Sequence, residues 1–215
     1  MTRLYRHMQR LVRLAPEWLV RFRPFAVYEI RLRGMNEQLL PRAAVLPCRV
    51  NWISDSAEAT ALRPLTRAEN IALLETRTCR AVAAWHNDRA VGCVWIARDA
   101  FEEVELGLRF ELRPSEAWLF AANVDSQWRN QGVYAQLLDF ISVELARSGL
   151  ERILLGVTLG NEPSRRVHER HGAVRVGSIM AIRSLGFRCC FRTGQISRSV
   201  SHPITWRRAI WLSVD

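Results

Sequence analysis

Lysine is absent from the 215 residues of this sequence, so all 31 basic residues are arginines. Against 21 acidic residues they give a formal net charge of +10. An arginine side chain stays charged at any working pH and binds phosphate or carboxylate groups through paired donors, so the composition favours anionic partners. A bias toward GC-rich codons explains the same composition equally well, and the excess of arginine alone identifies no partner.

Long apolar runs are also missing. No window reaches the roughly 18 uninterrupted apolar residues that predict a transmembrane helix. The N-terminal residues do not have the pattern of a secretory signal, because Arg3, Arg6, Arg10 and Arg13 interrupt the apolar core that such a signal requires. These two absences predict a cytoplasmic protein.

Cysteines are few and lack the spacing of metal ligands. There are five, an odd number, and most lie in apolar, strand-like runs, so we expect reduced thiols inside the core. Two of them are adjacent, but neighbouring residues on a strand point to opposite faces, and a disulfide between them would be strained. The sequence therefore predicts neither a disulfide nor a metal site. The cysteines are Cys48, Cys79, Cys93, Cys189 and Cys190.

A basic extension opens the chain, and we expect it to cover residues 1–47. Residues 1–22 combine arginines with apolar residues at helical spacing, which predicts an amphipathic helix. We favour a helix that lies on the domain with its arginines in solvent; the alternative is weak contact with an anionic membrane, at its inner face. Residues 25–33 alternate between apolar and polar and predict a strand, and residues 40–47 predict a connector.

Residues 49–114 predict a mixture of strands and one helix. Thr66 and, three positions later, Glu69 form a capping box, which predicts a helix that begins there and runs to about Thr78. Asn87 and Asp88 suit the tight turn of a hairpin. We expect strands at residues 49–53, 80–86 and 89–97, and an acidic loop or short strand at 99–114.

Two almost wholly apolar runs, 117–124 and 153–159, predict strands that are buried on both faces of a sheet. A helix between them makes the connection a crossover, so the two strands should be parallel. A short helix should follow at 163–172, and then two final strands at 173–185 and 187–192. The apolar face of the crossover helix comprises Val133, Leu137, Leu138, Ile141 and Leu145.

The loop between the first apolar strand and the crossover helix has the features of an anion site. The free N–H groups at the start of the helix point toward whatever lies at that end of the strand. Gly132 lets the backbone approach a ligand closely, and Arg129 adds a permanent positive charge. A diphosphate needs this combination, so the loop predicts a coenzyme site.

The run of residues 124–138 resembles the coenzyme A loop of the GNAT superfamily of N-acyltransferases, whose pattern is Gln/Arg-x-x-Gly-x-Gly/Ala after a strand. Arg129 and Gly132 match this pattern, and Tyr134 stands where the family usually has glycine or alanine. Residues 161–173 resemble a later motif of the family, in which an asparagine precedes a short helix that carries a tyrosine and ends at Gly-Phe. In that motif His168 replaces the tyrosine and Ala173 replaces the phenylalanine, and the matching residues are Asn161, Ser164, Val167 and Gly172.

The resemblance covers roughly residues 49–190 and implies an α/β fold with a mixed sheet. The GNAT fold would have about six to seven mostly antiparallel strands, with a central parallel pair splayed around the coenzyme, and flanking helices. The expected organisation is a basic N-terminal extension (1–47, helix plus strand), an acyltransferase domain (48–192) and a C-terminal tail that packs on the domain (193–215).

The resemblance also implies transfer of an acetyl or other acyl group from acetyl-CoA or another acyl-CoA to an amine, by direct attack on the thioester. The backbone of Ala122 and Val124 would meet the pantetheine or the thioester carbonyl. The amides of the loop would hold the diphosphate. The expected coenzyme-binding residues beyond those two are Arg129, Asn130, Gln131, Gly132, Val133, Tyr134, Asn161 and Ser164.

The reaction needs an acid for the leaving thiolate and a base for the attacking amine. His168 is the expected acid because it stands at the position of the family's proton-donating tyrosine, and an imidazole can serve as acid or base near neutral pH; the alternative is simple packing on the short helix. His171 is expected to be a cation at the helix end. Glu105 is the preferred base because it precedes the central strand. The other candidates for the base are Glu102, Glu103, Asp125 and a water molecule.

Two other functions compete with this interpretation. A GNAT-like protein without catalysis would bind acyl-CoA only, an alternative suggested by the missing tyrosine. A basic nucleic-acid-binding module is suggested by the net charge, but the arginines are spread along the whole chain and no nucleic-acid motif with interleaved aromatics occurs. We therefore expect a small-molecule or peptide amine acceptor, no metal, and a monomer or homodimer.

Overall fold

The computed structural model describes residues 20–32, 46–75, 79–103, 106–185, 187–198, 204–206 and 210–215. Most of the amphipathic helix predicted at 1–22 lies outside these residues, as do most of the 40–47 connector and Glu105. The predicted membrane contact and the choice of Glu105 as base therefore stay predictions.

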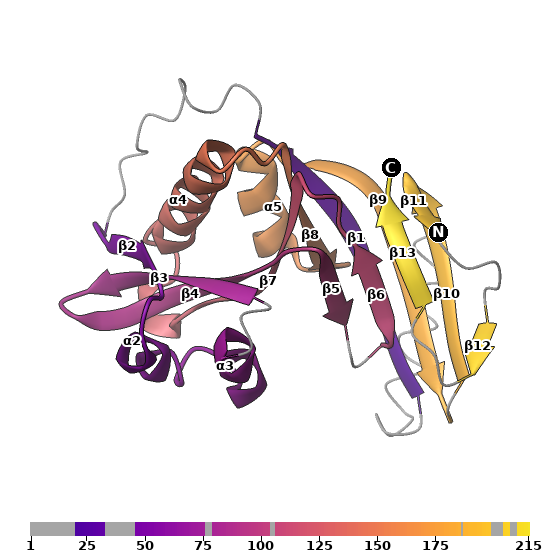
Figure 1. Cartoon of the computed structure of the whole chain (residues 1–215), viewed down its shortest axis with the longest axis horizontal. Coiled ribbons are helices and arrows are strands. Elements are labelled where there is room, and N and C mark those ends of the chain that lie inside the picture. The colour runs from indigo at the N-terminus through magenta and orange to yellow at the C-terminus, as the bar shows by residue number, and fades with distance from the viewer. Residues whose placement is uncertain are drawn as a thin grey trace.

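A large mixed sheet runs through the whole molecule (Figure 1). Within the described residues it contains nine strands in the order β12-β10-β9-β1-β8-β7-β4-β3-β2, and a second sheet contains four in the order β11-β13-β6-β5. The strands of the large sheet are β1 Val20–Arg31, β2 Arg49–Trp52, β3 Cys79–His86, β4 Arg89–Ala97, β7 Glu116–Val124, β8 Arg152–Thr158, β9 Val174–Ser184, β10 Phe187–Gly194 and β12 Ile204–Trp206. Those of the second sheet are β5 Ala100–Glu103, β6 Leu108–Glu111, β11 Ile196–Arg198 and β13 Ile210–Val214.

The mostly antiparallel α/β fold is as predicted, but the expected six to seven strands are too few. Part of the excess comes from the acidic segment 99–114, which forms the hairpin strands β5 and β6. One further strand, β1, comes from the N-terminal extension. The others, β11, β12 and β13, come from the residues after 192. These strands have three to five residues each, too short to show an alternating pattern in the sequence.

The predicted parallel pair, β7 and β8, lies at the centre of the large sheet and splays apart. The two strands pair only from Glu116↔Arg152 to Leu119↔Leu155. Beyond these pairs β7 continues to Val124 and β8 to Thr158 without pairing to each other. The parallel, splayed geometry is therefore confirmed, and the open end of the pair lies at the carboxyl ends of both strands.

The strand predicted at 25–33 is β1, and it lies between β8 and β9, antiparallel to both. Its side chains alternate between the two faces of the large sheet. Val27 packs toward the second sheet, whereas Tyr28 and Ile30 pack on the side of the helices. A strand from the first 47 residues thus belongs to the middle of the sheet, next to the splayed pair. The predicted division of the chain into an extension (1–47), a domain (48–192) and a tail (193–215) stays a prediction.

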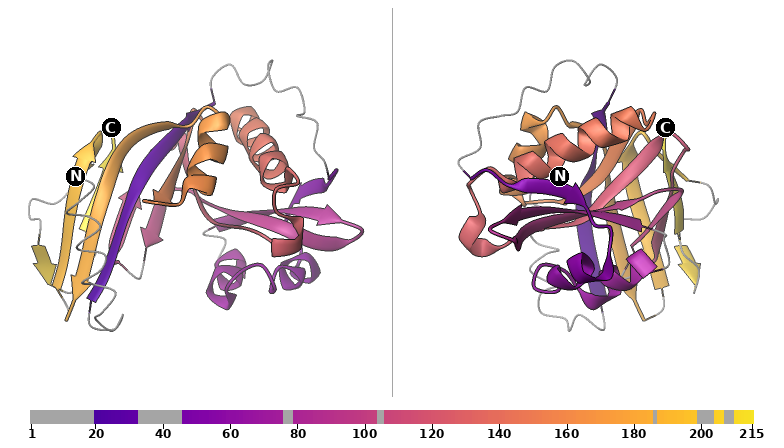
Figure 2. Two further views of the ribbon diagram at one scale, coloured as in Figure 1. Left: turned by 180° about the vertical axis from the view of Figure 1, so that it is seen from behind. Right: turned by 60° about the vertical axis from the view of Figure 1, so that its left-hand side comes forward.

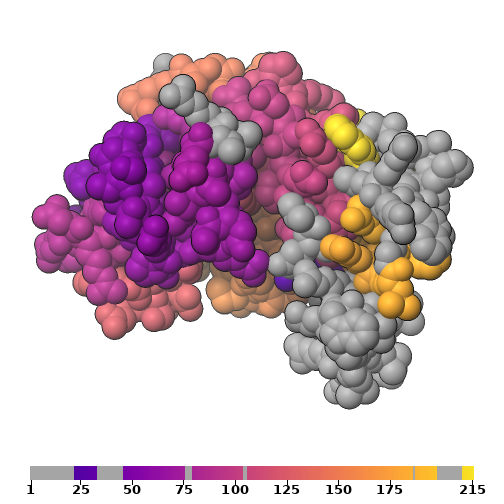
Figure 3. Space-filling model, turned by 60° about the horizontal axis from the view of Figure 1, so that its bottom comes forward, coloured from indigo at the N-terminus to yellow at the C-terminus, as the bar shows by residue number. Residues whose placement is uncertain are grey.

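Helices cover both faces of one half of the sheet (Figures 1 and 2). On one face lie α4 (Val133–Arg147) and α5 (Glu162–Arg170), and on the other lie α2 (Ser56–Ala61) and α3 (Ala68–Glu75). Figure 3 shows the side of the molecule on which α2 and α3 form the surface. The helix predicted from Thr66 is α3, but it ends at Glu75, and the hydroxyl of Thr66 accepts a hydrogen bond from Asn70 Nδ2 at 2.8 Å. The sequence did not predict α2, whose N-cap is Asp55.

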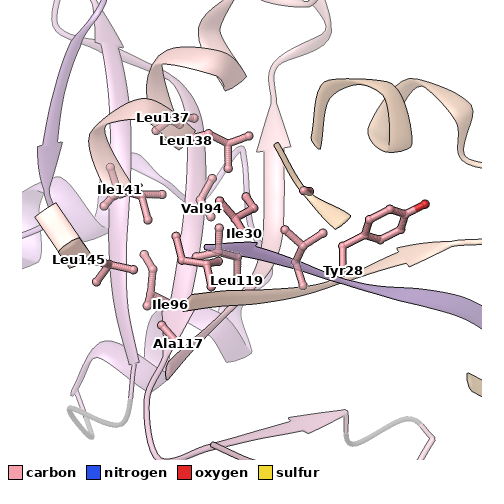
Figure 4. Packing of buried hydrophobic residues seen from close by; sticks show 14 of the residues in the cluster. Tyr28, Ile30, Val94, Ile96, Ala117, Leu119, Leu137, Leu138, Ile141 and Leu145 are labelled. Atoms are coloured by element: carbon pink, nitrogen blue, oxygen red, sulfur yellow. The ribbon is translucent and has the colours of Figure 1, made fainter. Parts of the chain in front are cut away.

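Three apolar clusters fill the spaces between these layers. The predicted apolar face of α4 is fully buried against the large sheet, as Figure 4 shows for Leu137, Leu138, Ile141 and Leu145. A second cluster lies between the two sheets, where the rings of Phe110 and Trp118 stack with centroids 4.3 Å apart. A third lies beneath α2 and α3. All five cysteines are free thiols, and burial raises the pKa of Cys93 to about 12.

A buried ionic cluster joins the strands at the closed end of the splayed pair. Arg152 lies at the start of β8, and its guanidinium contacts Glu116 of β7 at 2.6 Å and Glu29 of β1 at 3.3 Å. Both carboxylates are buried, with 4% or less of either residue exposed. Arg152 also donates to the carbonyl of Val214 in β13. The cluster therefore holds three neighbouring strands of the large sheet and one of the second sheet together.

Candidate active site

The open end of β7 contains a bulge. Phe120 pairs with Trp95 of β4 and Asn123 pairs with Cys93, so Ala121 and Ala122 together face a single residue of β4. Ala121 has a left-handed backbone, with φ of +46°, and both alanines are exposed. Because a bulge turns backbone groups out of the ladder, the predicted coenzyme residue Ala122 presents its main chain at the open end of the splayed pair.

The loop after β7 leads directly into α4. Ser126–Trp128 form a turn of 3-10 helix (η2), and Asn130 and Gly132 then take left-handed conformations, with φ of +62° and +82°. Arg129 Nε donates to the carbonyl of Val124 at 3.0 Å, which holds the guanidinium over the end of β7. The backbone of Val124 was predicted to meet the pantetheine or the thioester carbonyl, and its carbonyl already accepts this hydrogen bond.

The first turn of α4 offers several N–H groups without a side-chain cap. Its N-cap is Gly132, and the first backbone bond of the helix runs from Gln136 N to Gly132 O at 3.1 Å. Within the described residues, the N–H groups of Val133, Tyr134 and Ala135 donate no hydrogen bond. With the partial positive charge of the helix end, these donors and Arg129 can bind a diphosphate.

A short segment, residues 46–48 (the strap), is hydrogen-bonded to this loop and to the first turn of α4. Leu46 N donates to Gln131 O at 3.2 Å, and the side chain of Gln136 bonds both the carbonyl of Leu46 (2.8 Å) and the N–H of Cys48 (3.0 Å). In a trans peptide the C=O and the N–H point in opposite directions. Because Gln131 O points to the strap, the N–H of Gly132 in the same peptide points away from it. The sequence marks Gln136 only as a polar residue four positions after the N-cap glycine, a signal too weak to predict this role.

Replacement of Gln136 by leucine is expected to weaken acetyl-CoA binding up to about 30-fold, because two hydrogen bonds that fix the strap and the loop are lost at about 1 kcal/mol each. Gln127→Leu is the matched control, since within the described residues only the backbone of Gln127 forms hydrogen bonds, and its side chain bonds to neither the strap nor α4. Calorimetric titration with acetyl-CoA measures both. Equal affinities in the two variants would contradict a role for the strap.

The second predicted motif forms α5 at the end of β8. Asn161 is the N-cap, and its Oδ1 accepts from Ser164 N at 3.2 Å, so its side chain fixes the helix start. Tyr134 Oη and His168 Nε2 lie 2.7 Å apart, which brings the two motifs into contact. His168 Nδ1 lies 2.7 Å from the backbone carbonyl of Ser164. Burial lowers the pKa of His168 to about 4 and raises the pKa of Tyr134 above its ordinary value.

His171 lies at the C-cap of α5, where a cation was expected. Its Nδ1 lies 3.0 Å from the carbonyl of Val167, and its Nε2 lies 3.1 Å from Asp139 Oδ1 on α4. Both partners are hydrogen-bond acceptors. His171 thus links the two helices at a second point, beyond the contact between Tyr134 and His168.

Of the described carboxylates that were candidates for the base, only Asp125 lies in the loop. Glu102 and Glu103 lie on β5, on the face of the large sheet opposite α4 and α5 (Figure 1). Asp125 Oδ2 accepts from Arg89 at 2.7 Å and its Oδ1 accepts from Gln127 N at 3.2 Å, so both oxygens are engaged. Among the described residues, no three His, Cys, Asp or Glu side chains gather as a metal site requires, and no helix has the length and apolarity to span a membrane.

The sequence that forms this site matches a known protein family. Residues 49–173, more than half of the chain, match the model of the acetyltransferase (GNAT) family. The chain belongs to this family. The match contains the loop before α4 and ends just after α5, so both motifs of this GNAT domain lie inside it. Among curated proteins, none matches the sequence.

Solved structures show the same fold at low sequence identity. A functionally unknown conserved protein from Staphylococcus epidermidis is 12% identical with a TM-score of 0.54, over 82% of this chain and 66% of that one. A Drosophila protein is 13% identical (TM-score 0.56; 83% and 57%), and a GCN5-related N-acetyltransferase from Sphaerobacter thermophilus is 16% identical (TM-score 0.50; 86% and 57%). The chain thus spans two thirds or less of the length of these structures.

Proposed function

We propose that this GNAT domain transfers an acetyl or other acyl group from acyl-CoA to an amine by direct attack on the thioester. The observation that carries the proposal is the start of α4, where uncapped N–H groups follow a glycine N-cap at the open end of the splayed pair β7 and β8. The diphosphate would bind the N–H groups of Gln131, Gly132, Val133 and Tyr134, next to Asn130 and Arg129.

The rest of the coenzyme fits the same end of the sheet. The pantetheine would lie between the splayed strands, beside the bulge at Ala122 and beside Val124, with Asn161 and Ser164 on the other side. Free backbone N–H groups at such a bulge can stabilise the oxyanion that forms when an amine attacks a thioester. The net charge of +10 favours the approach of the anionic coenzyme.

Acetyl-CoA is expected to raise the melting temperature of the chain by about 5–10 °C at a hundred times Kd, because a ligand that binds only the folded state stabilises it by about 2.7 kcal/mol. A fluorescence melting curve with and without acetyl-CoA measures this shift. Release of thiol from acetyl-CoA in the presence of a polyamine, an amino sugar or short peptides with a free N-terminus then tests the transfer. No shift at saturating acetyl-CoA would contradict the proposal, whereas a shift without thiol release would favour a coenzyme-binding protein without catalysis.

A further inference from the structure

Tyr134 and His168 connect two helices that begin at the carboxyl ends of the two splayed strands. Tyr134 is in the first turn of α4, which follows β7, and His168 is on α5, which follows β8. The helices lie side by side on one face of the large sheet (Figures 1 and 2). The two rings meet edge to face, with centroids 5.4 Å apart, and Oη and Nε2 are 2.7 Å apart. A protein acid or base therefore lies next to the place proposed for the pantetheine.

The partners of His168 fix the direction of this hydrogen bond. The carbonyl of Ser164, 2.7 Å from Nδ1, can only accept, so Nδ1 carries the hydrogen. In the neutral ring Nε2 is then an acceptor, and the hydroxyl of Tyr134 must donate to it. The lone pairs of the tyrosine oxygen stay available to a third group. Burial keeps both side chains uncharged at neutral pH, since it lowers the pKa of His168 to about 4 and raises that of Tyr134.

Tyr134 and His168 are two of the three positions at which this chain departs from the family motifs that it resembles; the third is Ala173. Tyr134 stands where glycine or alanine is usual, and His168 stands where a proton-donating tyrosine is usual. A hydrogen bond joins the side chains of Tyr134 and His168. The tyrosine that is missing from α5 thus has a counterpart on α4, Tyr134. Its hydroxyl is hydrogen-bonded to His168, the residue that stands in the tyrosine's place on α5.

We propose that Tyr134 and His168 form a proton relay for the acyl transfer, an inference that rests on the proposed function. The amine nitrogen attacks the thioester carbon and forms the C–N bond. The proton that the nitrogen then loses passes to Tyr134 Oη, as the hydroxyl proton of Tyr134 passes to His168 Nε2. The C–S bond breaks with its electron pair on sulfur. Nε2 returns its proton to Oη, and the hydroxyl gives one to the thiolate, so the net transfer is one proton from nitrogen to sulfur.

In this relay Tyr134 is the catalytic residue, and His168 is a positioning residue that also stores the proton between the two steps. This arrangement differs from the role of direct acid that the sequence suggested for His168. With Nδ1 held by Ser164 O and Nε2 accepting from Tyr134, the neutral ring has no free hydrogen to donate to the thiolate. A purely structural role for the pair, as a link between α4 and α5, is the alternative that the experiments must separate.

Turnover with acetyl-CoA and the amine panel above tests the relay. Tyr134→Phe is expected to lower kcat about 100-fold or more while Kd for acetyl-CoA changes less than about threefold, because only proton transfer is removed. His168→Gln keeps an acceptor for the hydroxyl but cannot store a proton, so it should lose a similar factor. The exchange variant Tyr134→Ala/His168→Tyr, which restores a tyrosine on α5, should recover activity to within about tenfold of the unmodified chain. Tyr28→Phe, on β1, is the control and should leave kcat unchanged.

Nuclear magnetic resonance of the His168 ring supplies a readout that needs no turnover. The unmodified chain should show hydrogen on Nδ1 and a pKa of about 4. In Tyr134→Phe the pKa of His168 should rise, since the lost hydrogen bond to Nε2 stabilised the neutral ring. Tyr28→Phe should not change it.

Three outcomes would overturn the relay. One is unchanged kcat in Tyr134→Phe. Another is binding of acetyl-CoA by the unmodified chain without any turnover across the panel. The third is tighter acetyl-CoA binding with faster turnover in Tyr134→Phe, which would show that the pair obstructs the coenzyme. Absence of acetyl-CoA binding in the unmodified chain would instead contradict the proposed function, so the two failures are distinguishable.

Discussion

Replacement of Arg152 by leucine is expected to lower the free energy of unfolding by about 3–5 kcal/mol, because removal of one partner leaves buried charges uncompensated. Glu116 and Glu29 would lose the guanidinium that lies between them, 2.6 and 3.3 Å away. The exposed Arg113 and Arg31 contact the same two carboxylates from the surface, and they compensate for the lost guanidinium of Arg152 only in part. Urea unfolding followed by tryptophan fluorescence measures the change.

Arg147→Leu is the matched control for this experiment. Arg147 forms an ion pair with Glu144 at 3.0 Å, but its side chain is 68% exposed. Exposed pairs contribute about 0–1 kcal/mol, so the unfolding curve should hardly move. If the two variants lost the same stability, the cluster at the closed end of β7 and β8 would not be holding the strands together.

Replacement of Gly132 by aspartate is expected to weaken acetyl-CoA binding about 100-fold or more. At an effective dielectric constant of about 20, two unit charges about 5 Å apart repel by about 3 kcal/mol, and every 1.4 kcal/mol is a factor of ten in Kd. The new carboxylate would lie at the first turn of α4, where the diphosphate is proposed to bind. Calorimetric titration with acetyl-CoA measures the loss.

Gly132→Asn separates the effect of charge from that of backbone strain. Gly132 has φ of +82°, and both asparagine and aspartate tolerate this left-handed region better than other side chains do. Asn130 in the same loop already adopts φ of +62°. We expect the asparagine variant to lose at most about tenfold, from strain of about 1 kcal/mol. Equal losses in the two variants would contradict a diphosphate at this position.

Local patterns predicted the elements that carry the site. Asn87 and Asp88 indicated a tight hairpin, and both have positive φ in the turn between β3 and β4. The apolar face of α4 and the two apolar strands on either side of it predicted the crossover, and the crossover made β7 and β8 parallel. In each case the evidence lay within one element and its immediate neighbours in the sequence.

Contacts between distant residues could not be predicted in this way. The alternation of β1 indicates a strand, but nothing in it specifies a place between β8 and β9, more than a hundred residues away. The strap at 46–48 depends on Gln136, and the direction of the bond between Tyr134 and His168 depends on a carbonyl of α5. The sequence showed that both positions were unusual, and only the structure shows that they meet.

A crystal structure of the chain with acetyl-CoA tests the central claim most directly. We predict diphosphate oxygens within about 3 Å of the N–H groups of Gly132, Val133 and Tyr134. The pantetheine should run between β7 and β8, with its sulfur toward the hydroxyl of Tyr134. A coenzyme bound elsewhere on the protein, or a start of α4 that stays empty at saturating acetyl-CoA, would contradict the account.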